Sequence, residues 1–283
     1  MFNSDHFAFG KNWASYSSLI GSREVEEAEK GLLKLVERER LSGASFVDIG
    51  CGSGLHSLAA ARLGAGRIVA VDYDLDSVNT TKSLFERYTV AVPHQVERFD
   101  ILSGDALSRY GLFDVVYSWG VLHHTGDMWR AIENAAHLVR PDGVFVFSLY
   151  RRTYMDFFWK LEKVLYSKAP ELLQQIIKGV YVGAFRLGLL LSSRSFEAHV
   201  ANYRTTRGMD FYHDVHDWLG GYPYESATAS QVAQKLAELG FVRVREITQP
   251  TSVGLLGSGC NEYVYARQRS GGPASAPPPR PIG

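Results

Sequence analysis

The chain has 283 residues, of which 46% are hydrophobic, and its 30 basic and 30 acidic residues leave no formal net charge at pH 7. A chain of this length can bury a full core without help from disulfides or a metal. Balanced charge gives no overall field that attracts nucleic acid or anionic lipid, so neither is an expected partner. The two cysteines, Cys51 and Cys260, lie far apart in sequence and form no metal-ligand spacing, which favours a reducing compartment.

No segment is expected to cross a membrane. The most apolar stretch, residues 179–191, is shorter than the about 20 residues that a spanning helix needs, and it carries Arg186. The N-terminal residues lack the basic and apolar regions of a signal peptide. We therefore expect a cytoplasmic protein.

The first half of the chain shows the pattern of successive β-α units. Residues 44–149 alternate short apolar runs with helical patterns, which is typical of a parallel sheet. Strands are predicted at residues 44–49, 67–72, 96–102, 113–120 and 143–150. Helices are predicted at residues 22–40, 55–63, 74–90 (opened by Asp74 or Asp76) and 127–143 (ended by Pro141 and Gly143). This order predicts an α/β fold with a Rossmann-like, doubly wound sheet.

The pattern changes between residues 151 and 223, where the chain becomes rich in helical patterns and aromatic residues. A helix and a strand at 229–247 and a last strand at 261–268 return to the α/β pattern, so a helical insertion precedes the last two strands. The predicted divisions are an N-terminal helical segment (1–43), an α/β core (44–150), a helical insertion that caps the substrate (151–225), the rest of the core (226–268) and a disordered tail (269–283).

The stretch FVDIGCGSGLHSLAAARLGAGRIVAVDYD predicts a nucleoside-binding site. A strand that ends at Asp48 leads into Gly50, Gly52 and Gly54, where the missing β-carbons let the main chain pass close to a ligand. This turn lies at the carboxyl edge of the sheet, where open α/β sheets bind ligands. Asp72 ends the second strand, and its carboxylate can accept hydrogen bonds from both hydroxyls of a ribose. The spacing G-x-G-x-G differs from the G-x-G-x-x-G of dinucleotide enzymes.

Two later segments extend this site. LSGDAL follows the third predicted strand and places Asp105 and Ala106 where the edge of an adenine ring can be read. YSWGVLHHTGD follows the fourth predicted strand and continues the rim of the same pocket.

Together, the runs DIGCGSG, GDA and GVLHH and the acidic residue at position 72 resemble class I S-adenosylmethionine (SAM)-dependent methyltransferases. The resemblance covers about residues 44–149 and the two closing strands. It implies a seven-stranded sheet with an antiparallel last strand, SAM as the cofactor and S-adenosylhomocysteine (SAH) as its product. It also implies that Asp48 and Gly50 to Gly54 face the methionine portion, with Cys51 as a small neutral filler. Asp72 and the adjacent Tyr73 would then lie at the ribose. Asp105 and Ala106 would lie at the adenine, and Trp119 at the flank of the cofactor.

Aromatic residues near the N-terminus are candidates for covering the cofactor. N-terminal segments of this family often fold over it, so that Phe9, Trp13 and Tyr16 would cap the sulfonium and exclude water. The alternative is that these rings only pack a helix against the sheet.

Three histidines and a tyrosine are candidates for a general base. Methyl transfer is an in-line displacement, and a hydroxyl acceptor must also lose a proton. His123 and His124 lie on the rim after the fourth predicted strand, and the insertion offers Tyr203 and His216. Adjacent histidines at the rim commonly have a structural role in the family, so that alternative stays open.

Residues 202–228 are dense in polar and ionisable groups and are predicted to bind the substrate. The residues chosen for this role are Arg204, His213, Tyr222 and Tyr224. His213 with Asp217, or Asp214 with His216, would make an acid-base or metal pair, or would only stiffen a loop. No further histidine or cysteine cluster completes a zinc site, so no metal is predicted.

These observations predict a methyltransferase that acts at oxygen or nitrogen of a small or medium-sized molecule, such as a natural-product or sugar-containing intermediate. The alternatives are a peptide, protein or RNA methyltransferase, a non-catalytic SAM-binding module, or an NAD-dependent oxidoreductase. RNA is disfavoured because the chain lacks net positive charge and a basic accessory domain. Apolar residues at helical spacing in residues 155–191 are typical of a core or a dimer seam, which makes a homodimer through the insertion a further expectation. The alternatives are that this stripe forms an apolar substrate tunnel or lies on a membrane surface.

Overall fold

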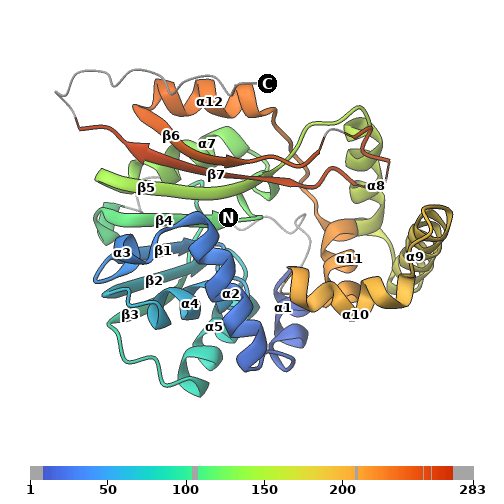
Figure 1. The fold of residues 1–283 in the computed structure, drawn as a ribbon, viewed down its shortest axis with the longest axis horizontal. Helices are drawn as coiled ribbons and strands as arrows, with labels where there is room; N and C mark the ends of the chain where they lie inside the picture. The colour runs from blue at the N-terminus through green and yellow to red at the C-terminus, as the bar shows by residue number, and fades with distance from the viewer. Residues whose placement is uncertain (1–8, 104–107, 208–209, 251, 256, 270–283) are drawn as a thin grey trace.

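The computed structural model describes residues 9–103, 108–207, 210–250, 252–255 and 257–269 (Figure 1). Asp105 and Ala106, two of the predicted adenine contacts, lie outside the described residues. The predicted tail at 269–283 lies outside them as well, apart from its first residue.

A seven-stranded mixed sheet forms the centre of the molecule, in the order β3-β2-β1-β4-β5-β7-β6. Its strands are β1 (Ser45–Ile49), β2 (Arg67–Asp72), β3 (His94–Arg98), β4 (Phe113–Trp119), β5 (Val139–Tyr150), β6 (Phe241–Ile247) and β7 (Cys260–Arg267). The first five strands pair in parallel, whereas β7 runs antiparallel to both β5 and β6. The structure thus confirms the predicted doubly wound sheet and its antiparallel last strand.

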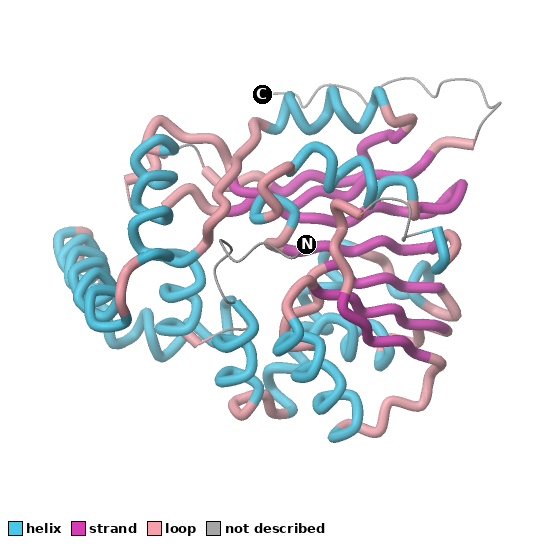
Figure 2. Tube along the Cα trace, turned by 180° about the vertical axis from the view of Figure 1, so that it is seen from behind, coloured by secondary structure: helices cyan, strands magenta, loops and turns pink. Residues whose placement is uncertain are grey.

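Helices cover both faces of this sheet (Figures 1 and 2). Successive strand residues point to opposite faces, so Phe46 belongs to one hydrophobic core and Val47 to the other. The first core includes residues of α2 (Ser22–Leu35), α4 (Leu55–Arg62) and α5 (Leu75–Arg87), and the second includes residues of α7 (Met128–His137) and α12 (Ala229–Glu238). Burial on both faces explains why the central strands are almost entirely apolar.

Several helix and strand ends differ from the predictions. The helix predicted over 22–40 ends at Leu35, and a short α3 (Arg38–Leu41) follows after two extended residues. The prediction for 127–143 is wrong beyond His137, because Val139 already pairs with Phe113 in the sheet. Pro141 and Gly143 lie in β5, beside a register shift of this pairing. The third strand is shifted toward the N-terminus, and residues 99–102 leave the sheet.

Four helices lie between β5 and α12, beyond the carboxyl ends of the parallel strands (Figure 1). They are α8 (Asp156–Lys168), α9 (Glu171–Leu191), α10 (Phe196–Arg207) and α11 (Phe211–Gly220), and we call them the cap. The N-terminal helix α1 (Phe9–Ser17) contacts α5 on one side and α11 of the cap on the other. Two short 3-10 helices, η1 (Ser108–Tyr110) and η2 (Leu122–His124), flank β4.

None of the described helices is by itself long and apolar enough to span a membrane. By length and composition, α9 passes this test only together with the first part of α10, and the two helices are bent by 114°.

Candidate active site

The loop between β1 and α4 makes a tight turn at the carboxyl edge of the sheet. Gly50, Gly52 and Gly54 all have positive φ angles, of 77°, 54° and 78°. A β-carbon at Gly50 would come within 2.3 Å of Val121, and one at Gly52 would come within 3.1 Å of the Trp13 ring. Glycine adopts the positive φ angles and leaves room for these two side chains, so the turn requires glycine at both positions.

Asp72, at the end of β2, faces this turn. Its Oδ2 accepts a hydrogen bond from the main-chain N–H of Gly52, and its Oδ1 accepts one from that of Asp74, both at 2.9 Å. Burial raises the pKa of Asp72 to about 6, although these main-chain donors act in the opposite direction. Each carboxylate oxygen is therefore held in place and still has a lone pair for a ligand.

Asp48, at the end of β1, is the second acid of this region, and only 3% of it is exposed. Its Oδ2 accepts a short hydrogen bond of 2.6 Å from the Ser57 hydroxyl. Burial raises the pKa of Asp48 to about 7, and the nearby charge of Asp72 adds to this effect. Asp48 thus takes up a proton far more readily than an ordinary aspartate.

We expect the unfolding free energy of the ligand-free protein to fall as the pH rises from about 4 to about 7. The pKa of Asp48 is higher in the folded than in the unfolded chain, so the stability that its bound proton provides is lost as the pH rises through about 7. This group contributes a slope of up to about 1.4 kcal/mol per pH unit. Asp48→Asn keeps an acceptor for Ser57 and should make the unfolding free energy, measured by urea denaturation, depend less on pH. An unchanged pH dependence would contradict the raised pKa of Asp48.

Helix α1 lies against the glycine turn and is fastened to it. The main-chain N–H of Gly10 donates to Asp74 Oδ2 at 3.0 Å, and the Trp13 ring lies beside Gly52. Tyr16 is almost fully buried and belongs to the core on this side of the sheet. Trp13 and Tyr16 also meet edge to face, with ring centroids 6.0 Å apart.

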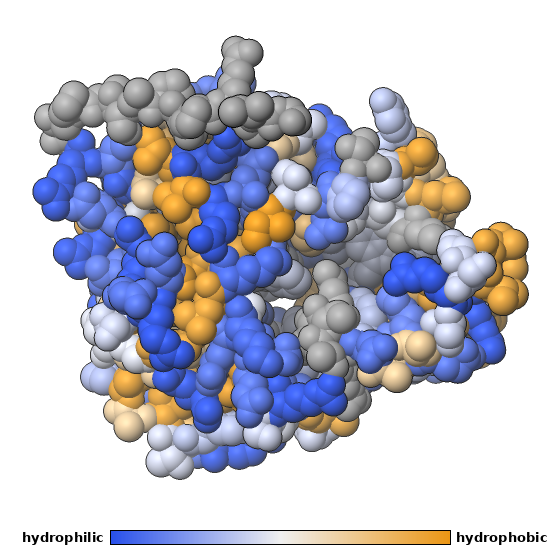
Figure 3. All heavy atoms as spheres, in the orientation of Figure 1, coloured by the Kyte–Doolittle hydropathy of each residue, from blue (hydrophilic) through white to orange (hydrophobic). Residues whose placement is uncertain are grey.

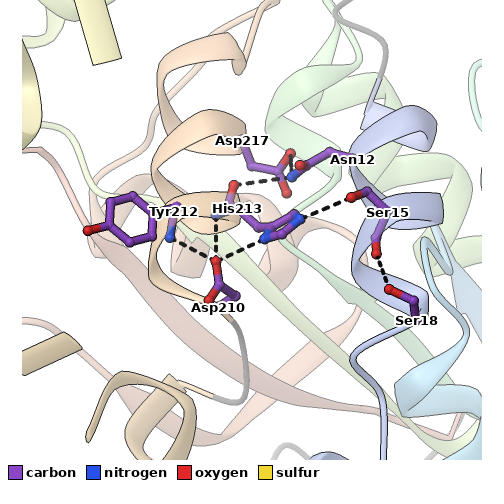
Figure 4. Close-up of polar contacts among 7 residues, drawn as sticks. All are labelled: Asn12, Ser15, Ser18, Asp210, Tyr212, His213 and Asp217. Carbon is purple, nitrogen blue, oxygen red and sulfur yellow. Dashed lines mark hydrogen bonds and ion pairs between the residues drawn. The ribbon is translucent and has the colours of Figure 1, made fainter. Parts of the chain in front are cut away.

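The other side of α1 is bonded to α11 (Figure 4). Asn12 Nδ2 donates to Asp217 Oδ1 at 2.8 Å and to the main-chain oxygen of His213 at 3.1 Å. The His213 ring stands between Asp210, 2.9 Å from Nδ1, and the hydroxyl of Ser15, 3.3 Å from Nε2. His213 thus connects the cap to α1 and pairs with Asp210 rather than Asp217, which fits the structural alternative, and it does not line the cavity as a predicted substrate contact would.

A cavity of about 1350 Å³ extends from the glycine turn to the cap. Pockets for one drug-sized ligand typically measure about 300–1,000 Å³, so this cavity has room for two ligands. One end is lined by the glycine turn, Asp48, Asp72, Tyr73, Trp119 and residues of α1 and α2. The other end is lined by Tyr150, η2 and residues of α9, α10 and α11.

His124, in η2, lies in the wall of the cavity and is 9% exposed. Its Nδ1 is 2.7 Å from the main-chain oxygen of Pro223. A carbonyl oxygen only accepts hydrogen bonds, so Nδ1 carries the proton and Nε2 is the lone-pair nitrogen of the neutral ring. The arrangement fixes the tautomer that a general base requires.

His123, also predicted as a base, is fully buried against Tyr150, with ring centroids 4.0 Å apart. Burial and the neighbouring His124 lower its pKa well below the usual value, and the main chain of Ser148 acts in the opposite direction. A ring that stays neutral and inaccessible packs the wall of the site, so the structural alternative fits His123.

Other predicted residues fall outside the cavity. His216 points to α8, where its Nδ1 is 2.7 Å from the Tyr166 hydroxyl, and this argues against a catalytic role and against a pair with Asp214. Tyr222 does not line the cavity, and Tyr224 is a buried residue that stacks on Tyr150.

Tyr203, in contrast, does line the cavity, and its hydroxyl donates to Asp214. The side chain of Arg204 lies outside the description.

Three residues that were not predicted as part of the site also line the cavity: His56, Trp218 and Glu262. Asp217, named only as a possible partner of His213, lines it as well. Glu262 accepts hydrogen bonds from the indole N–H of Trp119 at 3.0 Å and from Lys34 at 3.1 Å. Burial lowers the pKa of His56 to about 4. These residues lie on α4, α11 and β7, which are far apart in sequence, so only the fold brings them together. In the described part of the chain, no cluster of three or more histidine, cysteine or acidic side chains is arranged to hold a metal ion.

A doubly wound seven-stranded sheet with an antiparallel β7, a glycine turn after β1 and an acid at the end of β2 defines the class I methyltransferase fold. A family model described as "Methyltransferase domain" matches residues 21–202, which is well over half of the chain. The chain therefore belongs to this methyltransferase family, whose cofactor is SAM.

Individual relatives are similar over part of their length. Ubiquinone biosynthesis O-methyltransferase of Coxiella burnetii (strain Dugway 5J108-111) is 31% identical over 130 residues, 46% of this chain and 53% of that protein. Ribosomal protein L11 methyltransferase of Macrococcus caseolyticus is 30% identical over 158 residues, 51% of this chain and 49% of that protein. The chain thus spans about half the length of these curated relatives.

Among solved structures, magnesium protoporphyrin IX methyltransferase from Synechocystis PCC 6803, crystallised with SAH, has a TM-score of 0.51 at 15% identity. The match covers 87% of this chain and 84% of that chain. This likeness supports the fold.

Proposed function

We propose that the enzyme methylates an oxygen or nitrogen atom of a small or medium-sized biosynthetic intermediate by direct displacement. The observation that carries this proposal is the single cavity that joins the glycine turn to the cap and has room for two ligands. A surface site for a folded macromolecule would instead need an open face at the reacting end.

In this proposal, the cofactor lies at the end of the cavity that carries the glycine turn. Main chain at Gly50 to Gly54 accommodates the methionine portion and Asp72 accepts hydrogen bonds from the ribose, while Trp13 covers the turn. These residues fit SAM because both oxygens of Asp72 are already oriented by main-chain N–H groups and each keeps a lone pair for a ribose hydroxyl. SAM supplies a methyl group activated on a sulfonium.

The protein residues then have three tasks. The cap and α1 exclude water and hold the acceptor in line with the methyl group, which can supply a large part of the rate acceleration. Nε2 of His124 accepts the proton of a hydroxyl acceptor, with Nδ1–H held by the Pro223 oxygen. Tyr203 is the second ionisable candidate in the same wall of the cavity.

The relatives support more than one acceptor. The name ubiquinone biosynthesis O-methyltransferase supports oxygen on a small molecule, whereas ribosomal protein L11 methyltransferase keeps a protein acceptor as the second candidate. We favour the small molecule because the cavity has room for a second ligand beside residues of α9, α10 and α11. We also propose a cytoplasmic location, where such intermediates and SAM occur together.

The test is to incubate the enzyme with methyl-labelled SAM and a cell extract divided by ultrafiltration. We expect label in products of the small-molecule fraction and none in the protein or RNA fraction. Label that appears only in the macromolecular fraction would contradict the proposal. Boiled enzyme gives the background for both fractions.

The homodimer expected from the sequence remains a proposal, and the cap provides the surface for it. Exposed apolar side chains recur every three or four residues along α8 and α9, and Figure 3 shows hydrophobic residues gathered at that edge of the molecule. They are Tyr154, Phe157, Phe158, Leu161, Leu165, Leu172, Leu173, Ile176, Val180, Leu187, Leu190 and Leu191. In a dimer with a two-fold axis, this stripe would pack against the same stripe of the second copy.

We expect sedimentation equilibrium to show a dimer that Leu187→Glu converts to a monomer, because a buried unpaired carboxylate is strongly unfavourable. Leu187 is 55% exposed in the single chain, so the substitution should leave its melting temperature nearly unchanged. Glu171→Gln, on the same helix, is the matched control and should stay dimeric. A wild-type protein that is monomeric at all concentrations, or that associates only with lipid vesicles, would contradict the proposal.

A further inference from the structure

The cap end of the cavity is walled by aromatic rings. Rings from β5, α9, α10 and α11 line it: Tyr150, Tyr181, Phe185, Tyr203, Phe211 and Trp218. They hold one another at defined angles, since Tyr203 meets Phe211 and Tyr150 meets Trp218 nearly at right angles, with centroids 5.2 Å and 5.1 Å apart. Such a wall favours a flat, apolar ligand, since rings attract one another edge to face or offset.

The Trp218 ring is additionally fixed by a buried cation. Lys163 is fully buried, and its Nζ lies 3.6 Å from the centroid of Trp218 and 5.4 Å from that of Tyr224. Its ammonium also contacts Glu162 at 3.2 Å. Because the indole is already held in one place, its side chain loses less conformational entropy when a ligand stacks against it.

Two acids of α11 lie within this aromatic wall: Asp214, which accepts from the Tyr203 hydroxyl, and Asp217, which the proposed reaction does not use. Asp217 lines the cavity, and its Oδ1 accepts a hydrogen bond from Asn12 Nδ2 at 2.8 Å. Within the described part of the chain, no hydrogen bond or ion pair reaches its Oδ2. Burial raises the pKa of Asp217 well above its usual value, and the nearby charge of Asp214 adds to this effect, so the acid ionises readily only when a ligand donates to it.

From this geometry we propose that Asp217 anchors the acceptor. The acceptor is then a flat, apolar, ring-bearing molecule with an O–H or N–H group that donates to Asp217 Oδ2, and it carries no carboxylate or phosphate at that end. A ligand that donates to Oδ2 stabilises the ionised carboxylate and offsets the cost of ionising it, whereas an anion is repelled by it. This inference rests on the proposed function, because it concerns the second ligand of the same cavity.

Three probes with the same ring test the proposal: a naphthol, a naphthylmethylamine and a naphthoate. Their binding to the SAH complex is measured by saturation-transfer NMR, after calorimetry has shown that SAH binds. We expect the naphthol or the amine to bind at least about tenfold more tightly than the naphthoate. Whichever of the two binds more tightly identifies the donor as a hydroxyl or an amine.

Asp217→Asn should bring the three dissociation constants to within about threefold of one another, because the charge that discriminates among them is gone. Asn12→Ala tests whether the discrimination depends on the hydrogen bond between Asp217 and α1 rather than on the carboxylate itself. It breaks the same hydrogen bond but keeps the carboxylate, so discrimination should survive. Glu238→Gln, an exposed substitution on α12, should change nothing.

Equal binding of the naphthoate in the wild-type protein would overturn the proposal, as would equal loss of discrimination in Asn12→Ala and Asp217→Asn. Failure of all three probes to bind an intact SAH complex would also overturn it and leave the methyltransferase proposal standing. Failure of SAH itself to bind would instead count against the proposed function.

Discussion

Replacing Asp72 with alanine is expected to weaken the binding of SAH by about 10- to 100-fold. The substitution removes a carboxylate that can accept hydrogen bonds from two ribose hydroxyls, and hydrogen bonds to a charged group contribute about 1.5–3 kcal/mol. It also removes the acceptor that holds the main chain of Gly52 and Asp74. Isothermal titration calorimetry with SAH measures the change, and unchanged affinity would remove Asp72 from the cofactor site.

The pH dependence separates binding from folding in this experiment. Ribose hydroxyls donate to the ionised carboxylate, and burial raises the pKa of Asp72 to about 6, so SAH affinity should rise as the pH increases through about 6. Asp72→Asn keeps the shape of the side chain but cannot ionise. It should bind SAH more weakly than the wild type and lose this pH dependence, with a melting temperature closer to wild type than that of Asp72→Ala.

Changing His124 to asparagine is expected to lower kcat about 10²- to 10⁴-fold for a hydroxyl acceptor, the usual contribution of a positioned general base. The asparagine amide can still donate to the Pro223 oxygen, so the loop keeps its hydrogen bond while the basic Nε2 is lost. Turnover is measured as SAH release with the labelled small-molecule fraction. SAH affinity should be unchanged, because His124 is not part of the proposed cofactor contacts.

His216→Asn is the matched control, since His216 points away from the cavity to Tyr166. It should keep the wild-type kcat. The remaining activity of His124→Asn should also lose the rise with pH that titration of a base produces. Equal activity in His124→Asn and wild type would show that the acceptor needs no base from this residue, as for a neutral amine acceptor.

The central part of the fold was predictable because each strand of the parallel sheet is buried on both faces. Val47 and Phe46 serve different cores, so their strand is an unbroken apolar run that the sequence shows directly. Asp74 likewise marked a helix start, and its side chain accepts from the N–H of Asp76. The misplaced end of α7 has a different origin, because the pairing of Val139 with Phe113 depends on a distant strand rather than on local signals.

The cofactor end of the candidate site was predictable for a similar reason. Glycines with positive φ and an acid at a strand end are local features that leave a recognisable pattern. The cap end was not, since its contacts join residues far apart in sequence. Asn12 with Asp217 and His124 with Pro223 are such pairs, and the sequence alone left His123 and His124 equivalent. Residues near one another in the chain, such as His213 and Asp217, were paired wrongly for the same reason.

The central claim is that one cavity holds the cofactor at the glycine turn and the acceptor under the cap. A crystal structure of the protein with SAH tests it most directly. We predict SAH with its ribose hydroxyls on the Asp72 carboxylate, its amino-acid portion along Gly50 to Gly54, and its sulfur facing the part of the cavity that His124 and the cap enclose. SAH bound elsewhere, or a cavity end filled by side chains at the turn, would contradict the account.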